Sequence, residues 1–102
     1  MYNIFLVCEH GASTSMLMEK MADAAKKDGI EANVRAFPYT KLDEVIDGAD
    51  VVLLGPQVRF KKKTFEQQYA DKGIDFVVID TVDYGMMNGE KVLKAAIEHI
   101  KN

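Results

Sequence analysis

Four short apolar segments limit the folds open to this chain more strongly than any other feature. They cover residues 2–7, 32–37, 51–54 and 76–79. The first, third and fourth are nearly continuous in apolar residues, without the polar alternation that a solvent-facing side of a strand imposes. Continuous runs of this length are typical of parallel strands that are covered on both faces. We therefore expect a sheet whose two sides both pack against other elements.

Between these segments, apolar residues recur at helical spacing. A first helix would place four residues on one face: Leu17, Met21, Ala24 and Ala25. Gly29 stands where it would end this helix. Thr40 and Asp43 have the spacing of a capping box, which predicts a short helix through residue 46, closed by Gly48.

Two further helices are expected in the second half of the chain. One would cover residues 61–71 and end at Gly73. The other has Asn88 as a candidate N-cap. Its apolar stripe consists of Leu93, Ala96, Ile97 and Ile100.

Strand and helix thus alternate four times, which predicts an α/β fold. Right-handed crossovers favour an open four-stranded parallel sheet in the order 2-1-3-4, with helices on both faces. The whole chain, residues 1–102, fits one such domain. Ligands bind these sheets beyond the carboxyl ends of the strands, at the switch point beside strand 1. Cys8 directly follows the first apolar segment, so it falls at that point.

Composition narrows the classes of function. The net charge of -3 argues against nonspecific nucleic-acid binding, which needs a basic surface. No apolar run approaches the roughly 20 residues of a membrane-spanning helix, and the first eight residues read as a strand rather than a signal peptide. Cys8 is the only cysteine, so no intrachain disulfide can form, which fits a reducing cytoplasm.

The segment after Cys8 has the composition of an anion-binding loop. Small residues allow the backbone N–H groups to approach an anion closely, and three hydroxyl residues can cap the next helix or donate hydrogen bonds. The positive potential of a helix N-terminus favours the nucleophilic thiolate form of Cys8. We expect phosphate binding by seven consecutive residues: Glu9, His10, Gly11, Ala12, Ser13, Thr14 and Ser15.

Three known chemistries can be compared with this loop. A low-molecular-weight tyrosine phosphatase, whose core the expected fold resembles, needs arginine six residues after the cysteine, and Thr14 stands there. A thioredoxin-like redox role needs C-x-x-C, but Gly11 occupies the second position, and the nucleotide P-loop motif is absent. A thiol that accepts a phosphoryl group and passes it on fits the loop better. A cysteine phosphatase and a noncatalytic anion-binding module remain alternatives.

The loop also resembles a known family. C-E-H-G-A-S-T-S-M-L, from Cys8, is similar to the phosphocysteine loop of enzyme IIB subunits of the bacterial phosphoenolpyruvate-dependent sugar phosphotransferase system, lactose/cellobiose (chitobiose) class. The usual pattern there is C-x-x-G-x-S-T-S followed by apolar residues. The likeness extends to A-F-P at 36–38, A-D-V-V-L-L-G-P-Q at 49–57, Y-G at 84–85 and V-L-K-A-A at 92–96.

This resemblance implies a phosphoryl carrier. Enzyme IIA would donate a phosphoryl group from a phosphohistidine to Cys8, which would pass it to a sugar bound by the membrane subunit, enzyme IIC. The loop would hold the phosphoryl oxygens mainly through backbone N–H groups, without a metal or cofactor. The protein would work in the cytoplasm, recruited to the inner face of the membrane by enzyme IIC.

Two departures accompany the resemblance. Glu9 and His10 stand where the family commonly has small residues; Glu9 should turn to solvent, and His10 is expected to be a solvated residue that modulates transfer. Arg59 and the three lysines at 61–63 would lie on the same rim as Cys8 and steer docking onto an acidic partner surface. Candidate contacts with the phosphoryl group or a partner are Met16, Pro56, Gln57, Arg59, Lys61 and Tyr84.

Overall fold

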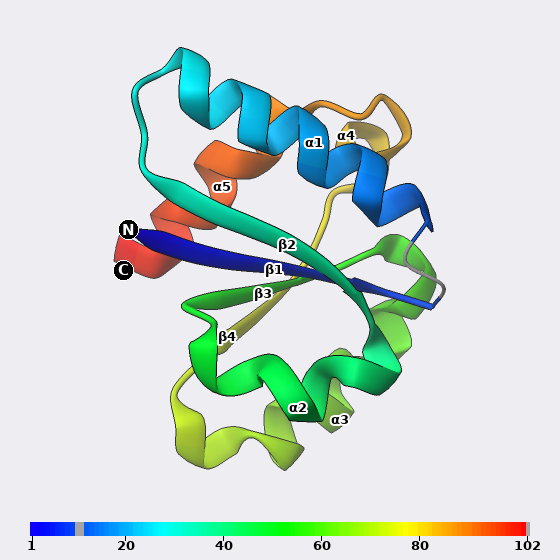
Figure 1. Ribbon diagram of the computed structural model, residues 1–102. Helices are drawn as coiled ribbons and strands as arrows, with labels where there is room; N and C mark the ends of the chain where they lie inside the picture. Colours follow the sequence, from blue (N-terminus) through cyan, green and yellow to red (C-terminus); the bar gives the residue numbers. More distant parts are fainter. Residues whose placement is uncertain (10–11, 102) are drawn as a thin grey trace.

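In the part of the chain that the structure describes, four strands alternate with helices, and two helices follow the last strand (Figure 1). The computed structural model describes residues 1–9 and 12–101, with the side chains of residues 12, 13 and 101 outside the description. The elements are β1 (Tyr2–Cys8), α1 (Ala12–Lys27), β2 (Ala32–Pro38), α2 (Leu42–Val45), β3 (Val51–Leu54), α3 (Lys62–Gln68), β4 (Asp75–Val78), α4 (Thr81–Gly85) and α5 (Gly89–Lys101). Short 3₁₀ turns precede or follow α2 and α3: η1 (Tyr39–Lys41), η2 (Ile46–Gly48), η3 (Pro56–Lys61) and η4 (Ala70–Lys72).

The strands form one parallel sheet in the order β2-β1-β3-β4. In the inner strand β1, Ile4 lies opposite Val34 of β2 on one side and Val51 of β3 on the other. At the carboxyl end of the same strand, Cys8 lies opposite Pro38. The α/β class, the parallel pairing and the predicted order 2-1-3-4 are therefore confirmed.

Helices cover both faces of the sheet. In Figure 1, α1 and α5 lie on one side of the strands, and α2 and α3 lie on the other. Alternate residues of β1 enter the two cores: Ile4 and Leu6 pack with α1 and α5, whereas Phe5 and Val7 pack with α2 and α3. All four side chains are buried. This two-sided burial explains why the first, third and fourth strands lack polar alternation.

Several helix ends lie where the sequence predicts them. Gly29 and Gly73 both have left-handed backbones, with φ of 70° and 66°, a conformation that favours glycine. The side chain of Asn88 caps α5, because its Oδ1 accepts the backbone N–H of Lys91 at 3.2 Å. The third helix is shorter than the predicted 61–71, because regular α-helix ends at Gln68 and η4 completes the segment.

Two features of the fold differ from the expectation. The capping box is wrong: Thr40 already lies inside η1, so it lacks the extended backbone of a cap, and neither η1 nor α2 has a side-chain cap. The second difference is α4, a five-residue helix that no periodic pattern indicated. Asp80 starts it, with its Oδ2 accepting the backbone N–H groups of Val82 and Asp83, both at 3.1 Å.

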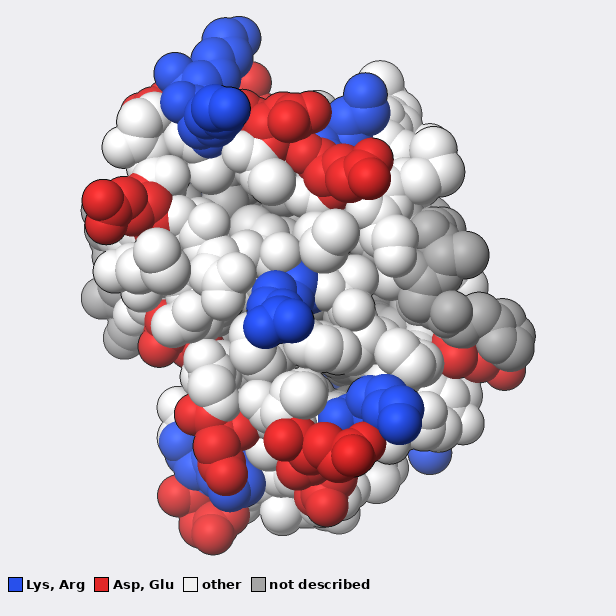
Figure 2. Space-filling model, viewed as in Figure 1, with Lys and Arg blue, Asp and Glu red and all other residues white. Residues whose placement is uncertain are grey.

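Charges of both signs are interspersed on the face shown in Figure 2. Acidic and basic side chains lie together over α1 and again over α2, while the middle of this face is largely uncharged around one basic group. The described part of this face therefore lacks the continuous positively charged surface that binds the phosphates of DNA. In the same described residues, the structure contains no helix with both the length and the apolar character needed to cross a bilayer.

The contact between α1 and α5 gives the first testable prediction. A Cβ added at Gly89 would clash with the carbonyl carbon of Lys20 and lie 2.6 Å from its oxygen, both backbone atoms of α1. We expect Gly89→Ala to lower the free energy of unfolding by about 2 kcal/mol or more, since the two helices must separate. Urea unfolding monitored by circular dichroism measures the change.

Gly85→Ala is the matched control. It also lies near the α4–α5 connection, but a Cβ there would meet nothing within 4 Å. Its midpoint in urea should equal or exceed that of the wild type, because alanine loses less backbone entropy than glycine in a helix. Equal midpoints for the two variants would show that the α1–α5 contact is not as close as described.

Candidate functional site

Cys8 is the last residue of β1, the inner strand from which the sheet extends toward β2 on one side and toward β3 on the other. The chain leaves β1 through α1 toward β2 at one edge, while β3 lies on the other side of β1. This is the switch point at which open parallel sheets bind ligands. Cys8 itself is only 4% exposed. A reactant must therefore reach into a recess to touch the thiol.

Thr14 contacts the thiol directly. The Sγ of Cys8 and the Oγ1 of Thr14 lie 3.3 Å apart in a buried contact, in which either atom can be the donor. Thr14 lies in the first turn of α1 and is fully buried. A threonine hydroxyl can accept from a thiol and donate to a thiolate, so this contact suits both forms of the cysteine.

The N-terminus of α1 points a positive field toward this recess. The helix begins at Ala12, four residues after Cys8, and its first turn contains no acidic side chain to neutralise the field. At its far end, the last turn contains Lys26 and Lys27, which complement the opposite pole. The helix as a whole therefore favours negative charge at the Cys8 end.

Gly55 forms the wall of the recess on the β3 side. It follows β3 directly, and its backbone N–H donates to the carbonyl of Val7 at 2.9 Å. A Cβ at Gly55 would lie 3.4 Å from the Cβ of Cys8, 3.7 Å from the Tyr84 ring and 3.0 Å from Oε1 of Gln57. The end of β1 and the segments that follow β3 and β4 thus meet around one glycine. Gly55 was not among the predicted site residues, although its position between a strand and Pro56-Gln57 was a usable signal.

The remaining predicted site residues differ in how they are placed. His10 and Gly11 lie outside the described residues, as do the side chains of Ala12 and Ser13. Glu9 and Ser15 are exposed. The structure places Thr14 against Cys8 and the Tyr84 ring beside Gly55, which adjoins Cys8, and it buries both side chains.

The candidate partner contacts lie mostly on the surface. Met16 is 57% exposed, Gln57 and Arg59 are exposed, and Pro56 and Lys61 are half-buried. Pro56, Gln57 and Arg59 line one open hollow together with Phe60. Phe60, which the sequence analysis did not select, is thus a further member of this surface.

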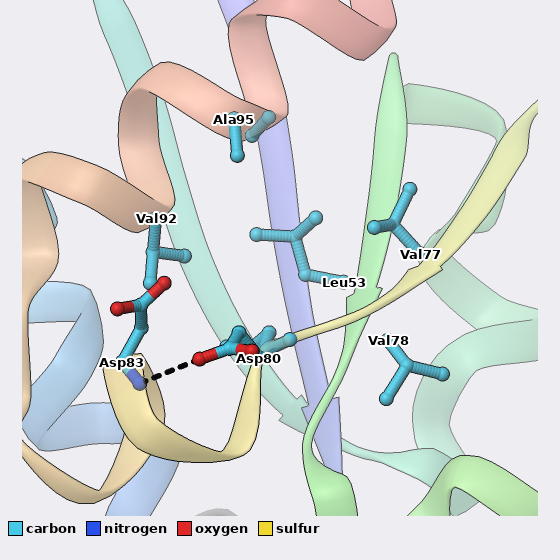
Figure 3. Close-up of a pocket in the computed structure, with 9 residues that line it drawn as sticks. Leu53, Val77, Val78, Asp80, Asp83, Val92 and Ala95 are labelled. Carbon is cyan, nitrogen blue, oxygen red and sulfur yellow. Dashed lines mark hydrogen bonds between the residues drawn. The ribbon is translucent and has the colours of Figure 1, made fainter.

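A second pocket lies apart from Cys8, between β4 and α5 (Figure 3). Its walls are mainly apolar side chains, and Asp80 and Asp83 are its acidic members. Asp80 is engaged as the cap of α4, and Asp83 lies 3.6 Å from Nζ of Lys91. An apolar pocket whose two charged groups are acidic is unsuited to a phosphoryl group, so we assign the site to Cys8.

Comparison with known proteins identifies relatives of the same length. The family model described as "PTS system, Lactose/Cellobiose specific IIB subunit" matches residues 3–95. The oligo-beta-mannoside-specific EIIB component of Bacillus subtilis is 37% identical, over all of this chain and 99% of the relative. The galactose-specific EIIB component of Lactococcus lactis subsp. cremoris is 40% identical, over 97% of this chain and 95% of the relative.

Solved structures agree in fold. A cellobiose-specific IIB component from Borrelia burgdorferi is 50% identical with a TM-score of 0.82, covering 99% of this chain and 93% of that one. A lactose-specific IIB domain from Streptococcus pneumoniae has a TM-score of 0.87 at 18% identity, covering 96% of each chain, and shows the fold alone. A YwlE mutant from Bacillus subtilis, with the low-molecular-weight tyrosine phosphatase fold, has a TM-score of 0.66 at 17% identity over all of both chains.

These matches agree with the sequence resemblance. The family model covers nearly the whole chain, and the named relatives are aligned over almost their full lengths. Cys8 is present at the end of β1, where the fold binds ligands. The chain therefore belongs to the lactose/cellobiose-specific IIB subunits of the phosphotransferase system, the sugar phosphoryl carriers of that class.

Proposed function

We propose that Cys8 is the residue that carries the phosphoryl group. The observation that supports this most strongly is the recessed thiol in contact with the Thr14 hydroxyl, at the N-terminal end of α1. A buried thiol with a hydroxyl partner and a positive field beside it suits a thiolate that attacks phosphorus. The enzyme is a transferase, and the phosphocysteine is the intermediate that we assign to it.

The proposed first step takes the group from a phosphohistidine of enzyme IIA. The Cys8 thiolate attacks phosphorus, an S–P bond forms, and the N–P bond to the donor imidazole breaks. The electron pair of that bond stays on the imidazole nitrogen. The N–H groups of the loop at residues 9–15 would hold the three phosphoryl oxygens, with Ser13, Thr14 and Ser15 as hydroxyl donors.

The second step delivers the group to a sugar of the cellobiose or lactose type, bound by enzyme IIC. A sugar hydroxyl oxygen attacks phosphorus, an O–P bond forms, and the S–P bond breaks. The hydroxyl proton passes to solvent, and the Cys8 thiolate is regenerated for the next cycle. We propose that this exchange takes place in the cytoplasm, with the protein recruited to the inner face of the membrane by enzyme IIC.

The residue at position 14 favours transfer over hydrolysis. A cysteine phosphatase of related fold would use a bidentate arginine there to stabilise a transition state that water attacks. Thr14 is instead neutral, fully buried and engaged with the sulfur. The fold likeness to YwlE, at 17% identity, carries no activity with it. A slow reaction with water is what a relay between two partners needs.

The most direct prediction of this proposal concerns Cys8 itself. Incubation with phosphoenolpyruvate, the general phosphotransferase proteins and a matching enzyme IIA should add one phosphoryl group to the protein, visible by intact-protein mass spectrometry. Cys8→Ser should remain unmodified, because the hydroxyl is a far weaker nucleophile than the thiolate. Wild type that stays unmodified with a competent enzyme IIA, or Cys8→Ser that accepts the group, would contradict the assignment.

A second prediction concerns the hydroxyl of Thr14. Thr14→Val keeps the shape of the buried side chain but removes the hydroxyl that contacts the sulfur. We expect single-turnover phosphorylation of Cys8 to slow by about tenfold to a hundredfold, the range for a lost hydrogen bond to a charged group. Rapid mixing with phosphorylated enzyme IIA, followed by acid-free quenching and mass spectrometry, measures the rate.

Thr14→Ser is the control for that experiment. It retains the hydroxyl and loses one methyl group, so phosphorylation should stay close to the wild-type rate even if stability falls. A valine variant that reacts as fast as wild type would show that the 3.3 Å contact has no part in transfer.

A further inference from the structure

Large exposed apolar side chains are concentrated at one end of the sheet. Among the described residues, five such side chains are strongly exposed, and four of them follow the carboxyl ends of strands: Met16, Phe60, Val82 and Met86. The fifth, Met1, is at the opposite edge, before β1. Single exposed apolar residues need no explanation, but a concentration on the edge that contains the reactive residue marks an interaction surface.

These four residues come from the segments that surround Cys8. Met16 lies in α1, which follows β1, and Phe60 lies in η3, which follows β3. Val82 lies in α4 and Met86 immediately after it, following β4. Because all four strands are parallel, the segments after them leave the sheet at the same edge as Cys8. A protein that reaches the recessed thiol must therefore cover this edge.

Phe60 is the most prominent aromatic group of this edge, at 70% exposed. It lines an open hollow with Pro56, Gln57 and Arg59. Gln57 connects this hollow to the surroundings of the thiol, since its Oε1 would lie 3.0 Å from a Cβ at Gly55, and that Cβ would lie 3.4 Å from the Cβ of Cys8. An exposed aromatic ring beside a hollow has the form of a binding anchor.

Basic side chains flank Phe60 on the same stretch of chain. Arg59 precedes it, and Lys61, Lys62 and Lys63 follow it. Two of these lysines open α3, whose first turn contains no acidic residue, so their charges oppose the helix dipole. Within the described residues, none of the ion pairs found uses these four side chains. Lys61 is held over aromatic rings, with its Nζ 5.1 Å from the centroid of Tyr39 and 6.0 Å from that of Phe60. The charges of Arg59, Lys62 and Lys63 are not needed for the ion pairs of the fold and are available to a partner.

We propose that this edge is the docking surface for the protein that donates the phosphoryl group, with Phe60 as the apolar anchor and the basic stretch 59–63 facing acidic groups of the donor. The proposal rests on the phosphoryl-carrier function above. A diffusing donor gains most from such a surface, since charge complementarity speeds encounter and the apolar anchor slows dissociation. The donor surface should accordingly combine an apolar patch with acidic neighbours around its phosphohistidine.

Replacement of Phe60 tests the anchor. Phe60→Ser should lower the second-order rate constant for transfer from phosphorylated enzyme IIA by about tenfold, the scale of a central interface residue. At saturating donor the first-order rate should approach that of wild type, since Phe60 does not touch the reacting atoms. Phe60→Leu, which keeps an apolar side chain, should restore most of the second-order rate. Rapid-quench single turnovers over a range of donor concentrations separate these quantities.

Paired lysine variants test the basic stretch. Lys62→Gln/Lys63→Gln should slow association and flatten its dependence on salt, while leaving stability equal or higher because the dipole is no longer opposed. The matched control is Lys26→Gln/Lys27→Gln, which makes the same change in net charge at the opposite end of α1. The control should keep the wild-type rate and salt dependence.

The outcomes distinguish this proposal from the function on which it rests. If wild type accepts no phosphoryl group from a competent donor, the phosphoryl-carrier assignment fails first. If wild type accepts it, and the Phe60 and lysine variants match wild type in rate and salt dependence, the docking proposal is overturned and the assignment of Cys8 stands. Alkylation of Cys8 by iodoacetamide should proceed equally in all variants. Parallel losses in alkylation and transfer would place the defect at the thiol and overturn docking as its cause.

Discussion

Parallel pairing of β1 on both of its sides is the constraint on which the rest of the structure depends. With β2 on one side and β3 on the other, the strand is held over nearly its full length, and its last residue is Cys8. Four consecutive residues before it, from Ile4 to Val7, are buried alternately in the two cores. The thiol therefore occupies a fixed position, and the groups that act on it are brought there by other elements.

Close approaches through glycine bring those elements to the thiol. Gly55 lets the segment after β3 lie against Cys8 and the ring of Tyr84, and Gly89 lets the start of α5 lie against the backbone of α1. Since α1 also carries Thr14, the packing of α5 on α1 and the geometry at the sulfur are connected through one helix. The site can thus be loosened by changes that are distant from Cys8 in sequence.

The sequence predicted the features that depend on local chemistry. Gly29 and Gly73 mark left-handed helix ends, Asn88 caps α5, and continuous apolar runs identify strands with two covered faces. The prediction failed for α4, whose five residues are too few for a periodic pattern, and for Thr40, which lies inside a 3₁₀ turn.

At the site, the sequence did not reveal Gly55 and Phe60, because a glycine's close contacts and the exposure of an aromatic ring depend on tertiary packing. The position of Thr14, six residues after Cys8, was visible in the sequence, but its 3.3 Å contact with the sulfur was not.

The central claim is that Cys8 holds a phosphoryl group for a sugar rather than for water. The most direct measurement starts from the phosphorylated protein, freed of its donor and mixed with membranes containing the matching enzyme IIC and its sugar. The account predicts that the phosphoprotein is stable alone, and that on mixing each phosphoryl group lost from it appears as sugar phosphate. Release as inorganic phosphate at the same rate with and without sugar would contradict the account and favour a hydrolase.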